Sequence, residues 1–328
     1  METKKRTARA VVERLSSASA ETRTAALAEL RLISKHDPES RPLIAAAGAL
    51  PCLVDSLYTT TGGGGDQENA AAALLNLSIS SRALLLSTPG LLDGISDLLL
   101  RHRHPTSPPP AAAVQSAAAT LHSLLLSEAH RGVIGAKRDI VFALIDIVRH
   151  RESPARSVKD ALKALFGLAL WAGNRAAMVE MGAVGAALGA VVNSGRGGRG
   201  GVREGGRGGG VGGLGGPQRR GVGGGRVREN AVAGLLNLAR WGGAAAKEEV
   251  RRACLEGGGE GVLEGLMEVA VSGTGKGRGK ARDLLGVLNN DVSGDGNQQD
   301  DATLGNLRFD HHLLHNLHHH HDCDVVSS

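Results

Sequence analysis

Pairs of leucines three positions apart recur along the chain, each at the end of an apolar run with helical spacing. The pairs are Leu27/Leu30, Leu74/Leu77, Leu121/Leu124, Leu165/Leu168, Leu235/Leu238 and Leu285/Leu288. The residues four before the first leucine are Arg23, Ala70, Ala117, Ala161, Ala231 and Ala281. Positions i, i+4 and i+7 share one face of an α-helix, so each unit is predicted to bury the same stripe.

Subtracting the positions of the first leucines gives steps of 47, 47, 44, 70 and 50 residues. The long step contains a Gly/Arg-rich run from Gly195 to Gly225. A period in the forties with helical spacing is typical of stacked two- or three-helix repeats of the armadillo or HEAT kind, since no such unit buries its apolar stripe alone. The sequence therefore predicts an all-α solenoid, a right-handed superhelix that binds along a surface.

The pattern divides the chain into five parts. We expect a capping helix at 1–20, repeats 1–4 at 21–192, a Gly/Arg-rich insertion at 193–226, repeat 5 with a partial repeat 6 at 227–290, and a His-rich tail at 291–328. Residues 195–225 include 18 glycines in 31 positions, a composition that cannot bury enough surface to fold. The insertion and the tail are predicted to be disordered.

Composition agrees with thin helical layers, because aromatic residues are only 2% of the chain. The net charge is +5, and Gly195–Gly225 alone carries six Arg and one Glu, which is also +5. The rest of the chain is therefore neutral, which argues against a basic groove that follows a phosphate backbone.

Cys52, Cys254 and Cys323 lie far apart and form no C-x-x-C pair, so neither a disulfide framework nor a zinc module is indicated. No apolar segment follows the N-terminus and no stretch is long enough to span a membrane. We expect a cytoplasmic and/or nuclear protein without a membrane partner.

The order within each unit is Ala-x-x-x-Leu-x-Asn-Leu-Ser, then Arg, an apolar pair, Gly-Ala and another apolar helix, and it resembles the armadillo repeat. Asn76 and Asn237 match the asparagine of that repeat. Residues 25–31 (AALAELR) and 44–54 (IAAAGALPCLV) look like the opening of the armadillo region of plant U-box ubiquitin ligases. The resemblance covers residues 10–290 and implies an armadillo-type α-solenoid.

The U-box motifs Cys-Pro-Ile and Asp-Pro-Val are not found in the sequence. Since the U-box docks the ubiquitin-conjugating enzyme, the resemblance implies no intrinsic ligase activity. Paired carboxylates, G-x-S-x-G and a phosphate loop are missing as well. We expect a protein that is not an enzyme and that uses no cofactor and no metal.

In related armadillo proteins the third helix of each unit lines a concave groove. The resemblance therefore points to the residues just before each second leucine: Glu29, Asn76, Ser123, Gly167, Asn237 and Val287. Trp171 and Trp241 follow their second leucines by three residues, where an indole can anchor a ligand. The predicted groove residues are Glu29, Asn76, Ser123, Trp171, Asn237 and Trp241. The alternatives are that the asparagines stabilise turns between helices and that the tryptophans pack on the next helix.

Two low-complexity segments suggest other chemistry. Arg196, Arg199 and Arg207 each precede Gly-Gly, a style that contacts RNA, but no aromatic residue is interleaved. Residues 311–324 hold seven His, yet a metal site needs fixed geometry that a disordered tail lacks. We interpret the first as a tolerated insertion and the second as a low-complexity tail.

The sequence thus predicts a non-catalytic scaffold that binds a protein or peptide in its concave groove. One alternative is substrate recognition in protein ubiquitination, as a relative of the U-box ligases. Another is RNA binding through the Arg-Gly-Gly insertion. The oligomeric state does not follow from the sequence.

Overall fold

The structure, a computed structural model, describes residues 1–59, 64–196, 222–255 and 260–289. Over these ranges the chain is helical and contains no strand, which confirms the predicted all-α class. The chain divides into two units, Met1–Leu288 and Asn289–Ser328. The insertion at 197–221 and the tail from 290 onward lie outside the described residues, so their predicted disorder stays a prediction.

Three kinds of helix alternate after the opening helix α1 (Glu2–Leu15). The ladder helices carry the leucine pairs: α2 (Ala20–His36), α5 (Gly65–Ser78), α8 (Ala111–Leu125), α11 (Ala155–Ala169), α14 (Val222–Trp241) and α17 (Gly275–Asn289). The linking helices follow them: α3 (Ser40–Ala46), α6 (Arg82–Leu86), α9 (Glu128–Ala136), α12 (Ala172–Glu180) and α15 (Gly243–Leu255). The companion helices are α4 (Ala49–Asp55), α7 (Leu91–Leu100), α10 (Arg138–Arg149), α13 (Ala183–Arg196) and α16 (Glu260–Ser272), with a short 3₁₀ turn η1 (Arg101–Arg103) after α7.

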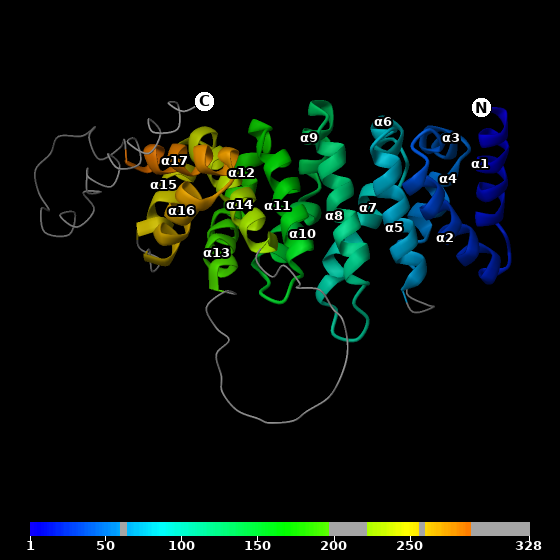
Figure 1. Cartoon of the computed structure of the whole chain (residues 1–328), viewed down its shortest axis with the longest axis horizontal. Coiled ribbons are helices and arrows are strands. Elements are labelled where there is room, and N and C mark those ends of the chain that lie inside the picture. The colour runs from blue at the N-terminus through cyan, green and yellow to red at the C-terminus, as the bar shows by residue number, and fades with distance from the viewer. Residues whose placement is uncertain (60–63, 197–221, 256–259, 290–328) are drawn as a thin grey trace, which may run out of the picture. The chain divides into compact units, whose positions relative to one another are not determined.

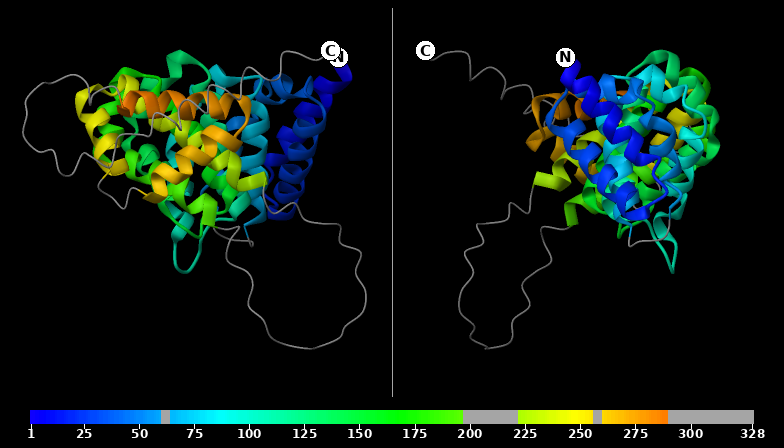
Figure 2. Two further views of the ribbon diagram at one scale, coloured as in Figure 1. Left: turned by 60° about the vertical axis from the view of Figure 1, so that its left-hand side comes forward. Right: turned by 90° about the vertical axis from the view of Figure 1, so that its right-hand side faces the viewer.

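Ladder helices from α2 to α14, and likewise the companion helices, lie side by side in chain order (Figure 1). The ladder helices contact one another in the series α2, α5, α8, α11 and α14. The companion helices form a second series in which α7, α10, α13 and α16 are neighbours. Seen from the N-terminal end, α1 lies in front of this stack (Figure 2). Each of the first five repeats therefore contributes one ladder helix to the row.

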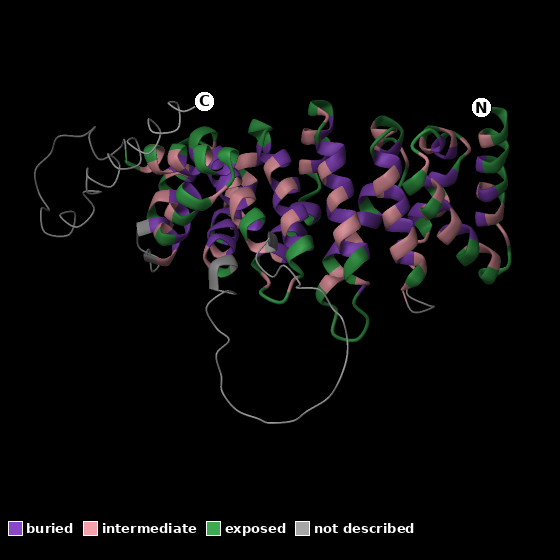
Figure 3. Ribbon diagram, viewed as in Figure 1, coloured by how far each residue is buried: buried purple, intermediate pink, exposed green. Residues whose placement is uncertain are grey.

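The predicted leucine pairs form the hydrophobic core between neighbouring ladder helices. Both leucines of the first five pairs are buried, while Leu285 and Leu288 are partly buried in the last described helix. The alanines four residues earlier are also buried, and their small side chains let neighbouring ladder helices approach closely. Gly167 shows how close, because a Cβ there would lie 2.9 Å from Leu125 Cβ. Figure 3 shows buried residues recurring in every layer from α1 to α17.

Turns between linking and companion helices depend on glycine at a recurring place. Gly48, Gly90 and Gly182 precede α4, α7 and α13 with φ of 92°, 77° and 82°. Non-glycine residues rarely adopt this left-handed conformation, so the glycine before these three companion helices has a steric cause.

Helix ends differ from the sequence prediction in several places. The helix α13 ends at Arg196 and α14 begins at Val222, so both reach into the expected insertion at 193–226. The last helix, α17, begins at Gly275, where α14 supplies a cap: the Glu229 carboxylate accepts a hydrogen bond from the backbone N–H of Thr274 at 2.6 Å. A cap from another helix leaves no local signal in the sequence.

Among the described residues no single helix is long and apolar enough to cross a bilayer. One bent pair, Ala172–Glu180 with Ala183–Asn193, meets the length and composition criterion together, across a bend of 73°.

The burial pattern predicts a sharp contrast between two leucines of one helix end. Leu124 is fully buried and Leu126 is 58% exposed. Leu124→Ala is expected to lower the free energy of unfolding by about 2–5 kcal/mol through cavity formation, and Leu126→Ala by less than about 0.5 kcal/mol. Chemical denaturation followed by circular dichroism measures both, and equal losses would refute the core assignment.

Candidate protein-binding face

One side of each of the first four ladder helices is left uncovered by its neighbours. In the first four repeats, the positions six before, two before, one after and five after the first leucine are all half-buried or exposed. We call these residues the ladder face: Glu21, Ala25, Ala28 and Leu32 on α2; Glu68, Ala72, Leu75 and Ile79 on α5; Gln115, Ala119, His122 and Leu126 on α8; Lys159, Lys163, Phe166 and Leu170 on α11. The spacing i, i+4, i+7, i+11 places them on one stripe of each helix.

The two asparagines predicted to line the groove have different surroundings. The amide Nδ2 of Asn76 is 3.0 Å from Ser34 Oγ and 3.5 Å from the Arg31 carbonyl oxygen, so it joins α5 to α2. Asn237 is 7% exposed, and its Nδ2 has no hydrogen-bond partner among the described residues. Asn76 thus stabilises the contact between two repeats, whereas the side-chain N–H donor of Asn237 has no partner among the described residues. A binding role for either asparagine stays a prediction.

The other positions before the second leucine are occupied by repeat-to-repeat contacts. The Glu29 carboxylate forms an ion pair with Arg14 of α1. Ser123 is 7% exposed, and its backbone carbonyl accepts a hydrogen bond from Arg82 Nε at 2.9 Å. Gly167 is buried against Leu125, and Val287 is half-buried. The structure therefore places these residues beside the ladder face rather than at its most exposed positions.

Trp171 and Trp241 lie at the C-terminal ends of α11 and α14 and are 44% and 65% exposed. A Cβ at Gly132 or Gly173 would lie 3.4 Å or 3.1 Å from the Trp171 indole nitrogen, so this ring packs beside α9 and the start of α12. Both indoles retain surface that a partner can bury, and that role stays a prediction.

A polar cluster joins α8 to α11 within the ladder face. The buried carboxylate of Asp160 accepts a hydrogen bond from Gln115 Nε2 at 3.2 Å and pairs with Lys163 Nζ at 3.3 Å and Lys159 Nζ at 3.7 Å. Burial, and then the positive charge of Lys163, lower the pKa of His122. Lys280 of α17 lies 5.2 Å from the centroid of the Phe166 ring. Three lysines against one carboxylate make this part of the face positive.

Arginines of the linking helices bind the C-terminal carbonyls of the ladder helices. The Nε of Arg41 donates to the Ser34 carbonyl at 2.7 Å, that of Arg131 to Leu125 at 3.3 Å, and that of Arg175 to Ala169 at 2.8 Å. Arg82 makes the equivalent bond to Ser123 in the next repeat. A cation at this end stabilises the unpaired carbonyls and the negative end of the helix dipole. The sequence showed the recurring Arg but not its partner.

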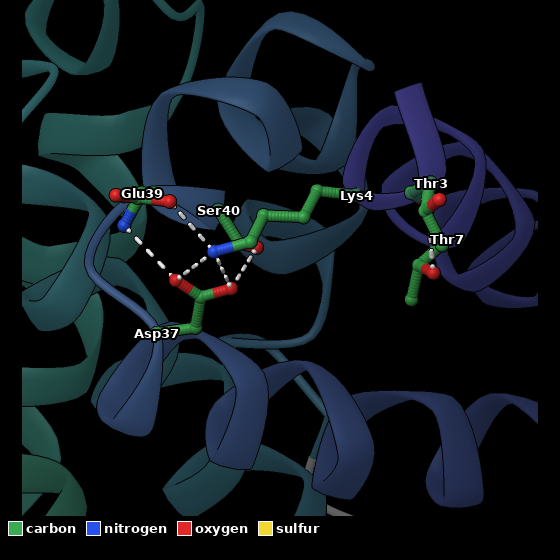
Figure 4. Close-up of polar contacts among 6 residues, drawn as sticks. All are labelled: Thr3, Lys4, Thr7, Asp37, Glu39 and Ser40. Atoms are coloured by element: carbon green, nitrogen blue, oxygen red, sulfur yellow. Dashed lines mark hydrogen bonds and ion pairs between the residues drawn. The ribbon is translucent and has the colours of Figure 1, made fainter. Parts of the chain in front are cut away.

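The N-terminal end of the stack is closed by an ion cluster (Figure 4). Lys4 Nζ of α1 lies 2.8 Å from the Asp37 carboxylate and 2.7 Å from that of Glu39, and Ser40 Oγ donates to Asp37 at 2.7 Å. These hydrogen bonds lower the pKa of Asp37 and raise that of Lys4. The single ammonium group of Lys4 is thus shared by the two carboxylates that follow α2.

Within the described ranges, no group of three or more His, Cys, Asp or Glu residues is arranged to hold a metal ion. Burial raises the pKa of the Cys254 thiol to about 11, so this thiol is protonated near neutral pH. The His-rich tail and Cys323 lie outside the described residues.

Solved structures with this arrangement are armadillo repeat proteins. A designed armadillo repeat protein matches with a TM-score of 0.60 at 19% identity, over 86% of this chain and 99% of that chain. A chain from a study of the interaction between cadherin and beta-catenin matches with a TM-score of 0.60 at 16% identity, over 87% of this chain and 47% of that chain. The chain therefore has the armadillo repeat fold.

Its homologues are plant U-box domain-containing proteins, as the motifs in residues 25–54 indicated. U-box domain-containing protein 16 of Arabidopsis thaliana is 31% identical over 283 residues, which are 81% of this chain and 39% of that protein. U-box domain-containing protein 17 of the same plant is 33% identical over 304 residues, 88% of this chain and 39% of that protein. The chain thus spans well under half the length of either relative. No family model matches it.

The environment of His122 gives a pH dependence with a definite sign. The pKa of His122 lies below its ordinary value of 6.5 in the folded state, so the fold favours the neutral imidazole. The free energy of unfolding is then expected to be largest above pH 6.5 and to fall as the pH drops below that value. Urea denaturation from pH 7.5 to 5.5 tests this, and His122→Gln should flatten the decrease. A stability that rises on acidification would contradict it.

Proposed function

We propose that the ladder face binds a segment of another protein and that the chain acts as a non-catalytic scaffold. The observation that carries the proposal is the row of ladder helices, which aligns equivalent half-exposed positions of successive repeats on one surface. A preordered surface of this kind lowers the entropy that binding must overcome. The concave groove expected from the sequence corresponds to this face.

A solved structure with a similar fold supports such a role. One designed armadillo repeat protein of this fold was solved in complex with the peptide (KR)4; it has a TM-score of 0.58 at 16% identity, over 86% of this chain. That peptide is basic, whereas Lys159 and Lys163 make the α11 part of the present face positive. A protein segment with carboxylates therefore suits this chain better than a basic one. We place its action in the cytoplasm and/or nucleus.

Similarity to U-box domain-containing proteins supports a second, narrower proposal, in which the bound segment belongs to a substrate or regulator of protein ubiquitination. The 328-residue chain is then expected to bind that protein without transferring ubiquitin. Incubation of the purified chain with activating and conjugating enzymes tests the point. Ubiquitin conjugates in that reaction would overturn the non-catalytic part of the proposal.

The RNA-binding hypothesis gains no support from the described residues. Arg196 ends α13 with a side chain outside the description, and Arg199 and Arg207 lie in the undescribed segment. It therefore remains a prediction from composition.

A steric block on the ladder face tests the main proposal. Ala119 is half-buried in the middle of the face on α8, and Ala119→Arg is expected to weaken a partner identified by proximity labelling in cells by at least about tenfold, because the long side chain occupies the surface. Gly185→Arg on α13 is the matched control: it adds the same charge at an exposed position with nothing within 4 Å of its Cβ.

Calorimetry with the purified partner measures both variants. Equal affinities of the Ala119→Arg and Gly185→Arg chains for every partner would show that binding occurs elsewhere.

A further inference from the structure

The ladder-face positions nearest the C-terminal ends of the ladder helices form a row of exposed aliphatic side chains. They stand five positions after the first leucine in four successive repeats: Leu32, Ile79, Leu126 and Leu170, which are 55%, 49%, 58% and 38% exposed. In repeat 5 this position is Arg240. We call the four residues the aliphatic row. Single exposed leucines are ordinary, but a large apolar residue exposed at one register through four repeats is a surface that water disfavours.

The start of the linking helices adds apolar surface near the same helix ends. Leu84 of α6 and Val133 of α9 are 45% and 53% exposed, and each stands two residues after an arginine. Those arginines, Arg82 and Arg131, use Nε to bind a ladder-helix carbonyl. Among the described residues neither guanidinium forms an ion pair with a carboxylate. Their terminal nitrogens are left to bind an acidic group.

Carboxylates near the row are few or already paired. Asp37 and Glu39, which follow α2, are bound by Lys4 (Figure 4). Glu180 at the end of α12 is 3.7 Å from Arg138. Glu128 is exposed at the start of α9 and is the acidic exception. The charge along the row is therefore positive, and a complementary partner carries carboxylates.

We propose that the aliphatic row binds an amphipathic α-helix of a partner protein, with apolar residues at seven-residue intervals and acidic residues beside them. This inference rests on the proposed function and adds the chemistry of the bound segment. Leucine-like side chains of the helix contact Leu32, Ile79, Leu126 and Leu170 in turn, and its carboxylates pair with Arg82 and Arg131.

The spacing of the repeats selects a helix over other peptide conformations. Neighbouring packed helices are about 8–10 Å apart, which sets the distance between members of the row. Seven residues of an α-helix advance about 10.5 Å and return to the same face, so one apolar residue per heptad matches one repeat. In a β-strand, residues about 10 Å apart are three positions apart and point to opposite faces. A polyproline helix can also place residues about 10 Å apart on one side. It does not present the broad apolar stripe that would cover the aliphatic row together with Leu84 and Val133.

Synthetic peptides test the proposal directly. The probe is a fluorescein-labelled helical peptide with Leu at every seventh position and Glu on both flanks of that stripe. Two comparison peptides carry Lys in place of Glu, or a Pro in the middle that breaks the helix. Fluorescence anisotropy is expected to show saturable binding of the Glu peptide to the full chain, with at least tenfold weaker binding of the other two.

Variants of the chain locate the binding. Ile79→Ser with Leu126→Ser is expected to weaken the Glu peptide by about tenfold or more, because two apolar contacts are lost. Val271→Ser removes an equally exposed apolar side chain, 57% exposed on α16, and should leave binding unchanged. Arg82→Gln with Arg131→Gln should weaken the Glu peptide but not a peptide with Gln flanks. Circular dichroism confirms that each variant is folded.

The inference is overturned if the Glu peptide shows no saturable binding, if the Lys or Pro peptide binds as well, or if row and control variants behave alike. Failure of the inference can be told apart from failure of the proposed function. Suppose that Ala119→Arg abolishes binding of a cellular partner and that Ile79→Ser/Leu126→Ser does not. The ladder face is then still the binding surface, but the aliphatic row does not bind a helix. Retention by both variants removes the proposed function itself.

Discussion

Burial of leucine between successive ladder helices is the interaction on which everything else in this chain depends. The helices α5, α8 and α11 are covered mainly by the ladder helices before and after them, so the apolar stripe of one repeat is incomplete without its neighbours. The small residues four positions earlier and Gly167 let the helices approach until the leucines interlock. Since that packing fixes the register between repeats, it also aligns the opposite, uncovered stripe into one surface.

Polar side chains form hydrogen bonds at the helix ends, where backbone carbonyls and N–H groups have no partner within the helix. Arginines of the linking helices bind the C-terminal carbonyls, and Arg82 does so across a repeat boundary. At the N-terminal end of α17, Glu229 of α14 supplies the missing acceptor. These contacts bring cations to the same end of the ladder helices as the exposed aliphatic residues. The chemistry of the proposed binding surface is thus partly a by-product of satisfying the backbone.

The repeat period and the heptad-like leucine spacing were sufficient to predict the fold class, the ladder helices and the buried leucines, because burial leaves a periodic signal in the sequence. The site was predicted less well. Asn76 and Glu29 were placed correctly on the helix side next to the ladder face. Their partners, Ser34 and Arg14, belong to neighbouring helices, so the sequence pattern did not reveal these contacts. The aliphatic row does have a signal, an apolar residue five after the first leucine in each of the first four repeats. Sequence alone could not separate it from core residues, since exposure depends on what packs against each position.

One arginine has a consequence for the unusual length of the fourth step. Arg175 donates from Nε to the Ala169 carbonyl at the end of α11 and from Nη1 to the Trp241 carbonyl at the end of α14, 2.5 Å away. It thereby joins the C-terminal ends of α11 and α14, the ladder helices that come before and after residues 197–221 in the chain. The alignment of α14 on α11 is supported there and by the leucines of the two helices. The chain can therefore accept sequence of varied length and kind at that connection, which makes it a natural place to graft a tag or a foreign domain.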